Sequence, residues 1–252
     1  MEFSAFDSLF HACLEANGLT HLYKVDIVIN LHKLTEHMCS VNSSMNLTRI
    51  TEPRDIILRH YVDSLTLLPH LPQGAHLLDV GCGAGFPSLP LAIARPDLHI
   101  TALDSTDKKV QYVNQTAALL GLSDRLHAIT SRAEEAAAPG MPLRESFDVV
   151  TGRAVAGLPL LTELCVPFLK VDGIFIAMKG GKAAEEMNEA TGAYRTLGMT
   201  AATLLPCCIH APEASDAQQD PPEDHALIIA RKARKTPEIY PRKYARMLKK
   251  PL

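Results

Sequence analysis

Apolar residues in the first 70 positions recur every three or four residues, the spacing of one face of an α-helix. Two such series are present: Phe6, Leu9, Phe10 and Cys13, then Ile56, Leu58, Tyr61, Val62 and Leu65. Pro53 suits the first turn of the second helix, and Pro69 and Pro72 suit its end. Asn42 to Asn46 is polar and turn-like. Residues 1–72 are therefore predicted to form a helical N-terminal extension.

From about residue 75, short apolar runs alternate with helical periods. The expected strands cover residues 75–80, 99–103, 126–130, 147–151, 174–179, 200–208 and 226–231. The expected helices cover residues 87–94, 108–120, 160–169 and 183–197. Alternation of this kind is typical of an α/β fold with a mostly parallel sheet, so residues 73–231 are predicted to form a Rossmann-like domain. The last two strands are separated only by a polar loop, Pro212–Asp224, which predicts an antiparallel edge hairpin.

Composition agrees with this class of fold. The chain has 252 residues, of which 47% are hydrophobic and only 5% aromatic, so its core must be aliphatic. The first residues lack a basic secretory signal, and no apolar stretch reaches the roughly 20 residues that span a bilayer. The six cysteines show no C-x-x-C spacing, so we expect reduced thiols, no bound metal and a cytoplasmic protein.

Charge is distributed unevenly along the chain. The net charge of −3 conceals residues 231–252, which hold nine Lys and Arg residues against one acid, Glu238. Residues 232–252 are therefore a basic C-terminal tail on an acidic body. Such a tail either contacts a polyanion or is simply solvated, and its composition is compatible with both.

The strongest motif lies where the first expected strand ends, at Asp79, Gly81, Gly83, Gly85 and Phe86. Glycines in a strand–loop–helix unit let a ligand approach the backbone closely. Dinucleotide enzymes prefer G-x-G-x-x-G, which this spacing does not match. The arrangement D-x-G-x-G-x-G looks like motif I of class I methyltransferases, where the loop wraps the methionine end of S-adenosylmethionine.

Two later strand ends supply further candidates for cofactor binding. Asp104, followed by Ser105, ends the second strand, and an acid there accepts ribose hydroxyls in adenosyl and NAD enzymes alike. It is alternatively an ordinary helix N-cap, with Ser105 and Thr106 as rivals. Ala133 and Glu134 follow the third strand and are candidates for the adenine edge. Alternatively, they only open a helix capped by Ser131.

The exits of the fourth and fifth strands carry Arg153 and Lys179, where an open α/β sheet places its chemistry. Neither an Asn/Asp-Pro-Pro-aromatic run nor a Pro-Cys nucleophile stands there, and Pro206-Cys207-Cys208 lies in the sixth strand. A substrate atom that is already nucleophilic, such as guanine N7, needs neither group. Arg153 and Lys179 would then bind phosphate or a base carbonyl. Alternatively, Lys179 is an ordinary strand-end cation and Arg153 forms a salt bridge next to a helix.

Several short segments together resemble one family, the bacterial small-subunit ribosomal RNA guanine-N7 methyltransferases (RsmG, glucose-inhibited division protein B). They are Asn46-Leu47-Thr48, Arg59-His60, Asp63-Ser64, Asp79 to Pro87, Leu103-Asp104-Ser105, Ser131 to Glu135, Arg153-Ala154, Lys179-Gly180, Tyr240-Pro241-Arg242 and Lys249 to Leu252. The family usually has Gly at position 88 and Gly-Thr-Pro at 245–247, where this chain has Ser88 and Ala245-Arg246-Met247.

The resemblance implies a monomeric S-adenosylmethionine-dependent enzyme that methylates N7 of one guanine in 16S ribosomal RNA or the small ribosomal subunit. By position, it implies cofactor contacts from Gly81, Phe86, Ala133, Glu134 and Arg153. It also brings Arg59, His60 and Asp63 to the mouth of the active site, with His60 joining Arg153 and Lys179 as catalytic candidates. The candidate RNA contacts are Arg59, Asp63, Arg242, Lys243, Lys249 and Lys250.

Plainer interpretations of these residues stand beside the resemblance. Arg59 and Asp63 are also an ordinary i,i+4 pair, and a lone histidine such as His60 is more often structural. Three other functions compete for the whole chain: a methyltransferase for a small molecule or protein, an NAD(P)-dependent oxidoreductase, and a non-catalytic RNA-binding module. Phe86 in place of the last fingerprint glycine opposes the oxidoreductase.

Overall fold

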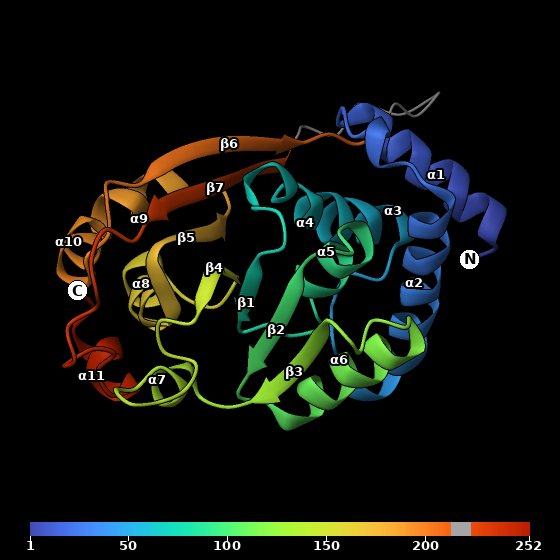
Figure 1. Cartoon of the computed structure of the whole chain (residues 1–252). Coiled ribbons are helices and arrows are strands. Elements are labelled where there is room, and N and C mark those ends of the chain that lie inside the picture. Colours follow the sequence, from blue (N-terminus) through green and yellow to red (C-terminus); the bar gives the residue numbers. More distant parts are fainter. Residues whose placement is uncertain (213–222) are drawn as a thin grey trace.

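A computed structural model describes residues 1–212 and 223–252, and its strands form one seven-stranded sheet (Figure 1). The strand order is β3-β2-β1-β4-β5-β7-β6. The strands are β1 His76–Val80, β2 His99–Asp104, β3 Leu126–Thr130, β4 Phe147–Arg153, β5 Leu169–Lys179, β6 Thr203–Ile209 and β7 Glu223–Arg231. Most of the loop expected over Pro212–Asp224 lies outside the described residues.

Helices precede and alternate with the strands, as the periodicity predicted. The α-helices are α1 Phe3–Ala16, α2 Val25–Met45, α3 Pro53–Ile56, α4 Asp63–Leu65, α5 Ser88–Ala94, α6 Asp107–Leu119, α7 Ala133–Ala136, α8 Leu158–Cys165, α9 Ala183–Glu189, α10 Thr191–Leu197 and α11 Tyr244–Lys249. Short 3₁₀ turns are η1 Thr20–Leu22, η3 Leu68–His70 and η4 Val166–Phe168. Between α3 and α4 the chain is π-helical over η2 Ile57–Val62.

Strands β1 to β5 run parallel, whereas β7 is antiparallel to both β5 and β6. The predicted α/β class and the antiparallel edge hairpin are therefore confirmed. The chain leaves β1 toward β2 and β3 on one side of the sheet and returns to β4 and β5 on the other. In an open α/β sheet, ligands bind outside the carboxyl ends of the strands at such a reversal.

Alternate residues of each strand face opposite layers of the molecule. Leu77 packs into the core that contains α1, α2, α5 and α6, whereas Leu78 packs into the core that contains α8 and α10. Phe6, Phe10 and Tyr61 of the N-terminal region are completely buried in the first of these cores. The N-terminal helices therefore share one hydrophobic core with the sheet, on its right-hand side in Figure 1.

Two boundaries differ from the expectation in ways that matter for the site. Residues 42–45, expected as a turn, are the last turn of α2, and only Asn46 is left-handed. The Asn42 side chain bonds both the N–H and the carbonyl of Thr48, so its polarity serves the following loop while its backbone stays helical. Strand β4 continues to Arg153 rather than ending at Thr151, which extends the strand to the candidate residue itself.

Residues 232–252 pack against the Rossmann-like domain. The Lys232 ammonium is fully buried and donates to Glu145 Oε1 at 2.9 Å and to the carbonyl of Leu169 at 2.7 Å. Glu163, also buried, accepts bonds from the backbone and the guanidinium of Arg242. Met247 is completely buried and fixes α11 to α8.

Candidate functional site

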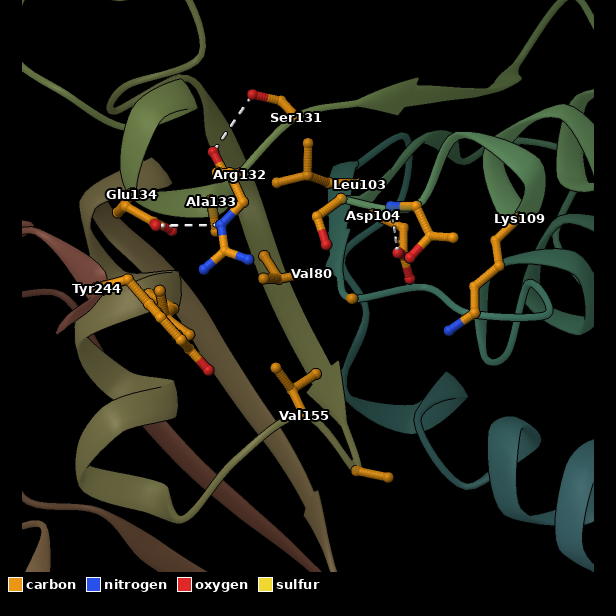
Figure 2. A pocket seen from close by; sticks show the side chains of 15 residues that line it. Val80, Leu103, Asp104, Lys109, Ser131, Arg132, Ala133, Glu134, Val155 and Tyr244 are labelled. Carbon is orange, nitrogen blue, oxygen red and sulfur yellow. Dashed lines mark hydrogen bonds and ion pairs between the residues drawn. The ribbon is translucent and has the colours of Figure 1, made fainter. Parts of the chain in front are cut away.

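A cavity of about 270 Å³ lies at the carboxyl ends of β1 to β4, and we call it the glycine-loop cavity (Figure 2). It is lined by Val80, Gly81, Leu103, Asp104, Ser105, Thr106, Lys109, Ser131, Arg132, Ala133, Glu134, Ala154, Val155, Leu164 and Tyr244. Five of the predicted cofactor residues are in this lining: Gly81, Asp104, Ser105, Ala133 and Glu134. The start of the loop after β1, the acid that ends β2 and the turn after β3 thus lie around one cavity.

The glycine loop is held in a shape that side chains would prevent. Gly81 has a φ of +75°, and a Cβ there would meet the Val155 side chain at 2.5 Å. Gly85 has a φ of +85°, and a Cβ there would meet Leu89 at 2.5 Å. The N–H of Gly81 donates to the Leu103 carbonyl at 2.7 Å. The loop therefore forms a bare backbone wall tied to the end of β2.

Asp79 lies beneath this loop and is completely buried. Its Oδ2 accepts a bond from Ser88 Oγ at 2.6 Å, whereas its Oδ1 has no partner among the described residues. Burial raises the pKa of Asp79 to about 7, although the Ser88 hydroxyl opposes that shift. Asp79 therefore orders the start of α5 and keeps an unused acceptor behind the loop.

Asp104 connects three parts of the cavity. Its Oδ2 accepts from the N–H of Gly83 at 3.0 Å and its Oδ1 from the N–H of Thr106 at 2.9 Å. Thr106, and not Asp104, occupies the N-cap position of α6, and its side chain makes no cap hydrogen bond. Asp104 therefore does not act as an ordinary N-cap of α6. A carboxylate accepts about four hydrogen bonds, so Asp104 retains capacity for hydroxyl groups in the cavity.

The turn after β3 forms the opposite wall. Ala133 opens α7, but the residue before it is Arg132, and Ser131 does not cap the helix. Instead, Ser131 Oγ donates to the Arg132 carbonyl at 3.3 Å. The Arg132 guanidinium donates to Glu134 Oε1 at 3.2 Å. Figure 2 shows this pair next to Tyr244, which comes from α11.

A second cavity, of about 500 Å³, adjoins the first, and we call it the Arg153 cavity. It is lined by Ile50, Arg59, His60, Asp63, Arg153, Ala154, Met178, Lys179, Gly180, Glu186 and His225. Ala154 lines both cavities and has a φ of +55°, which is uncommon for a residue with a side chain. The left-handed turn at Ala154 thus separates the glycine-loop cavity from the cavity that holds the catalytic candidates.

Arg153 organises the second cavity. Its Nη1 donates to Asp63 Oδ2 at 2.9 Å and to the Arg59 carbonyl at 2.8 Å, and its Nη2 lies 3.3 Å from His60 Nδ1. Phe86 stacks on the His60 ring at 4.2 Å between centroids, and it does not line the glycine-loop cavity. The candidates from the N-terminal helix and from β4 therefore do meet, with Phe86 as their support.

The charges in this cluster are largely compensated. Burial, together with the Arg153 charge, lowers the pKa of His60 to about 3, so its imidazole is neutral near pH 7. Burial alone would raise the pKa of Asp63, but hydrogen bonds from His225 and Arg153 hold it below its usual value. His60 Nε2 also lies 3.1 Å from Thr48 Oγ1. Both ring nitrogens of His60 are thus occupied, which suits a positioning role.

Lys179 ties together the loops that surround the second cavity. Its Nζ donates to the Ala156 carbonyl at 2.6 Å and to Glu186 Oε2 at 2.7 Å. Glu186 in turn accepts from the N–H of Leu158 at 2.8 Å. Lys179 therefore fixes the segment after β4, and its side chain is mostly buried.

Several residues that line the cavities were not among those predicted from the sequence: Lys109 and Tyr244 in the first, and Glu186 and His225 in the second. His225 Nδ1 lies 3.1 Å from Asp63 Oδ1. The antiparallel hairpin was a signal for His225, because it brings the start of β7 beside the end of β5, where Lys179 pairs with Ala226. Tyr244 carried no comparable signal, since its helix has only six residues.

The candidate RNA contacts have different surroundings. Arg59, Lys243, Lys249 and Lys250 are exposed, and Arg59 also lines the second cavity. Arg242 instead holds Glu163, and this ion pair gives it a structural partner. The exposed cations of the tail therefore lie on and beside α11, whose Tyr244 reaches the glycine-loop cavity.

Comparison with known proteins adds an independent observation. Residues 28–213 match the family described as GidB: rRNA small subunit methyltransferase G. The chain belongs to this family. It is 40% identical to ribosomal RNA small subunit methyltransferase G of Clostridium botulinum, covering 84% of each chain. It is 42% identical to that of Limosilactobacillus fermentum, covering 85% of this chain and 86% of the other. The resemblance drawn from the short motifs is confirmed.

Solved structures show the same fold at much lower identity. A Thermotoga maritima SAM-dependent O-methyltransferase superimposes with a TM-score of 0.52 at 16% identity, over 80% of this chain and 73% of that one. The [4+2]-cyclase SpnF superimposes with a TM-score of 0.54 at 17% identity, over 82% of this chain and 96% of that one. Because this fold accommodates different reactions, the family match identifies the chain as a methyltransferase that uses S-adenosylmethionine.

The glycine-loop cavity fits this cofactor. The bare backbone at Gly81 and the remaining hydrogen-bonding capacity of Asp104 suit a ligand that carries hydroxyl groups and approaches the loop closely. Within residues 1–212 and 223–252, no cluster of His, Cys, Asp and Glu could hold a metal ion. Over the same residues, no helix is long and apolar enough to cross a membrane.

Proposed function

We propose that this chain transfers a methyl group from S-adenosylmethionine to N7 of a guanine in 16S ribosomal RNA. The observation that carries the proposal is the pair of adjoining cavities, one lined by the methyltransferase motifs and the other by Arg153, joined at Ala154. The curated relatives are named for methylation of small-subunit ribosomal RNA. The sequence resemblance supplies the atom, guanine N7.

The cofactor supplies an electrophilic methyl group when it is bound. Gly81 and Asp104 would hold it by backbone approach and by hydrogen bonds to its ribose, and Ala133 and Glu134 would face its base. Gly83 and Gly85 shape the loop, Ser105 lines the cavity beside Asp104, and Phe86 supports His60. The protein then has to align a nucleophile with the methyl carbon and exclude water.

The groups around the second cavity suit a nucleophile that loses no proton. Its carboxylates, Asp63 and Glu186, already accept bonds from Arg153 and Lys179, and His60 is neutral and fully bonded. Guanine N7 offers a lone pair without a proton, so it requires no general base. Arg153 is positioned to orient a base carbonyl or a phosphate, while Asp63 compensates its charge.

RNA would approach across exposed cations. Arg59 stands at the second cavity, and Lys243, Lys249 and Lys250 stand on or beside α11. Contacts of this type orient a nucleic acid on the protein and make its affinity depend on salt. We place the activity in the cytoplasm, where small ribosomal subunits are the available substrate, and we expect the chain to act as a monomer.

The test is methyl transfer from radiolabelled S-adenosylmethionine to 30S subunits, naked 16S RNA and a total protein extract, followed by digestion of labelled RNA to nucleosides. We expect label in N7-methylguanosine from 16S RNA. Arg153→Ala, assayed in parallel, identifies label that depends on this site. Label in protein or in another nucleoside would agree with a methyltransferase activity but would contradict guanine N7 of 16S RNA as its substrate.

A further inference from the structure

Tyr244 lies close to the C-terminus of the chain, and its side chain reaches the glycine-loop cavity. It is the first residue of α11, and its half-buried side chain is part of the cavity lining. The Arg132 guanidinium carbon lies 4.4 Å from the centre of its ring. In Figure 2 the ring lies beside Arg132, on the other side of the view from Asp104 and Lys109. The first residue of α11, which belongs to the C-terminal tail, thus forms one wall of the cavity.

The position of the ring is set by apolar packing as well as by Arg132. Leu160, Leu164 and the fully buried Met247 form a small cluster, against which Ala133, Ala156 and Tyr244 pack. Leu164 and Ala133 also line the cavity, so cluster and cavity share a boundary. Tyr244 therefore occupies a defined place at the junction between α11, α8 and the turn after β3.

The two ends of the cavity differ in chemistry in a way that matches an adenosyl group. At one end the Asp104 carboxylate is suited to ribose hydroxyls. At the other end lie the turn 131–134 and the aromatic ring of Tyr244, with the Arg132 guanidinium over the ring. Planar bases stack favourably on aromatic rings, and a cation over the ring is attracted to its face.

We propose that Tyr244 binds the base of the adenosyl group against its ring, so that the C-terminal segment is part of the cofactor site. Cofactor binding and docking of α11 are then coupled, and coupling between two binding events is reciprocal. If the tail contacts RNA, which rests on the proposed function, RNA held by Lys249 and Lys250 tightens cofactor binding through the same residue.

The first test is calorimetric titration of the full chain with S-adenosylhomocysteine, which carries the same adenosyl group. We expect Tyr244→Leu to weaken binding about tenfold, because stacking of a base on an aromatic ring is lost while apolar packing is kept. Tyr244→Phe, which retains the ring, should remain within about twofold of the wild type. Leu248→Ala alters an exposed residue of the same helix and serves as the matched control.

The second test is hydrogen exchange of residues 244–249 with and without S-adenosylhomocysteine. We expect the ligand to slow exchange in the wild type and not in Tyr244→Leu, with equal exchange in both proteins when ligand is absent. A Kd for Tyr244→Leu within twofold of the wild type overturns the proposal, as does a loss of affinity that accompanies release of α11 in the free variant. Neither measurement uses RNA, so both test the role of Tyr244 even if 16S RNA proves not to be the substrate.

Discussion

The N-terminal helices and the C-terminal segment each add a wall to the site, but they are attached to the sheet differently. Phe6, Phe10 and Tyr61 bury the N-terminal helices in the main core, with side chains that are 0% exposed. The C-terminal segment is attached largely by polar contacts, which include the ion pairs Lys232–Glu145 and Arg242–Glu163 and the bonds from Arg144 to two of its carbonyls. Its apolar contacts are fewer: Met247 is buried, and Tyr240 and Leu252 are partly buried. One wall is held mainly by buried apolar area and the other mainly by polar contacts.

This difference implies different stabilities for the two cavities. Regions with few buried apolar contacts open locally at lower cost than the global core. The N-terminal wall of the Arg153 cavity should therefore persist as long as the fold persists. The Tyr244 wall of the glycine-loop cavity should open more readily, and bound cofactor or RNA should close it.

The largest expected effect is on stability, from Phe6→Ala. Removing a fully buried phenylalanine should lower the free energy of unfolding by about 3–5 kcal/mol, because it loses apolar burial and leaves a cavity. Phe3→Ala on the same helix, where the side chain is 42% exposed, is the control and should cost far less. Urea denaturation should show one shifted transition. Separate melting of residues 1–72 would contradict the shared core.

The next effect is on catalysis. Arg153→Ala removes the contacts to Asp63 and His60, and displaced positioning groups typically cost about 100-fold in turnover. Arg153 does not line the glycine-loop cavity, so affinity for S-adenosylhomocysteine should change by less than about threefold in the same variant. Single-turnover methylation of 30S subunits measures the first quantity and calorimetry the second. A large loss of cofactor affinity would show instead that Arg153 contributes to cofactor binding.

A smaller effect tests the polar attachment of the C-terminal segment. Glu163→Gln removes the buried charge that Arg242 bonds, and we expect a loss of about 2 kcal/mol. Because the segment buries few apolar side chains, hydrogen exchange should accelerate in residues 240–250 before it does so in the sheet. Glu189→Gln alters an exposed glutamate and is the matched control. Uniform acceleration throughout the molecule would show that the segment unfolds only globally.

Most of the sheet could be predicted because apolar runs and helical periods are local properties of the chain. Gly81 and Asp104, which the motifs singled out, both line the first cavity, since each motif ends a strand and parallel strands end at one edge. The roles that distant side chains play were less accessible. Phe86 was expected at the cofactor but stacks on His60, a contact between residues 26 positions apart.

Two of the missed residues, His225 and Tyr244, share a physical cause. His225 and Tyr244 enter the cavities from the antiparallel strand β7 and from the short helix α11. Their positions depend on tertiary packing rather than on any local period. The basic composition of the tail drew attention to its charges, whereas its structure depends equally on the buried Met247 and on Glu163 outside the tail.

A further expected effect, spread over about three pH units, concerns Asp79, in the sheet that both regions share. Its pKa of about 7 exceeds the unfolded value of roughly 3.9, so the stability it contributes is complete below pH 4 and is lost as pH rises toward 7. The loss should be at most about 1.4 kcal/mol per pH unit. Asp79→Asn cannot ionise, so its unfolding free energy should fall less steeply than that of the wild type between pH 4 and 7. Urea denaturation across that range measures both slopes, and parallel curves would show that Asp79 is already ionised in the folded chain.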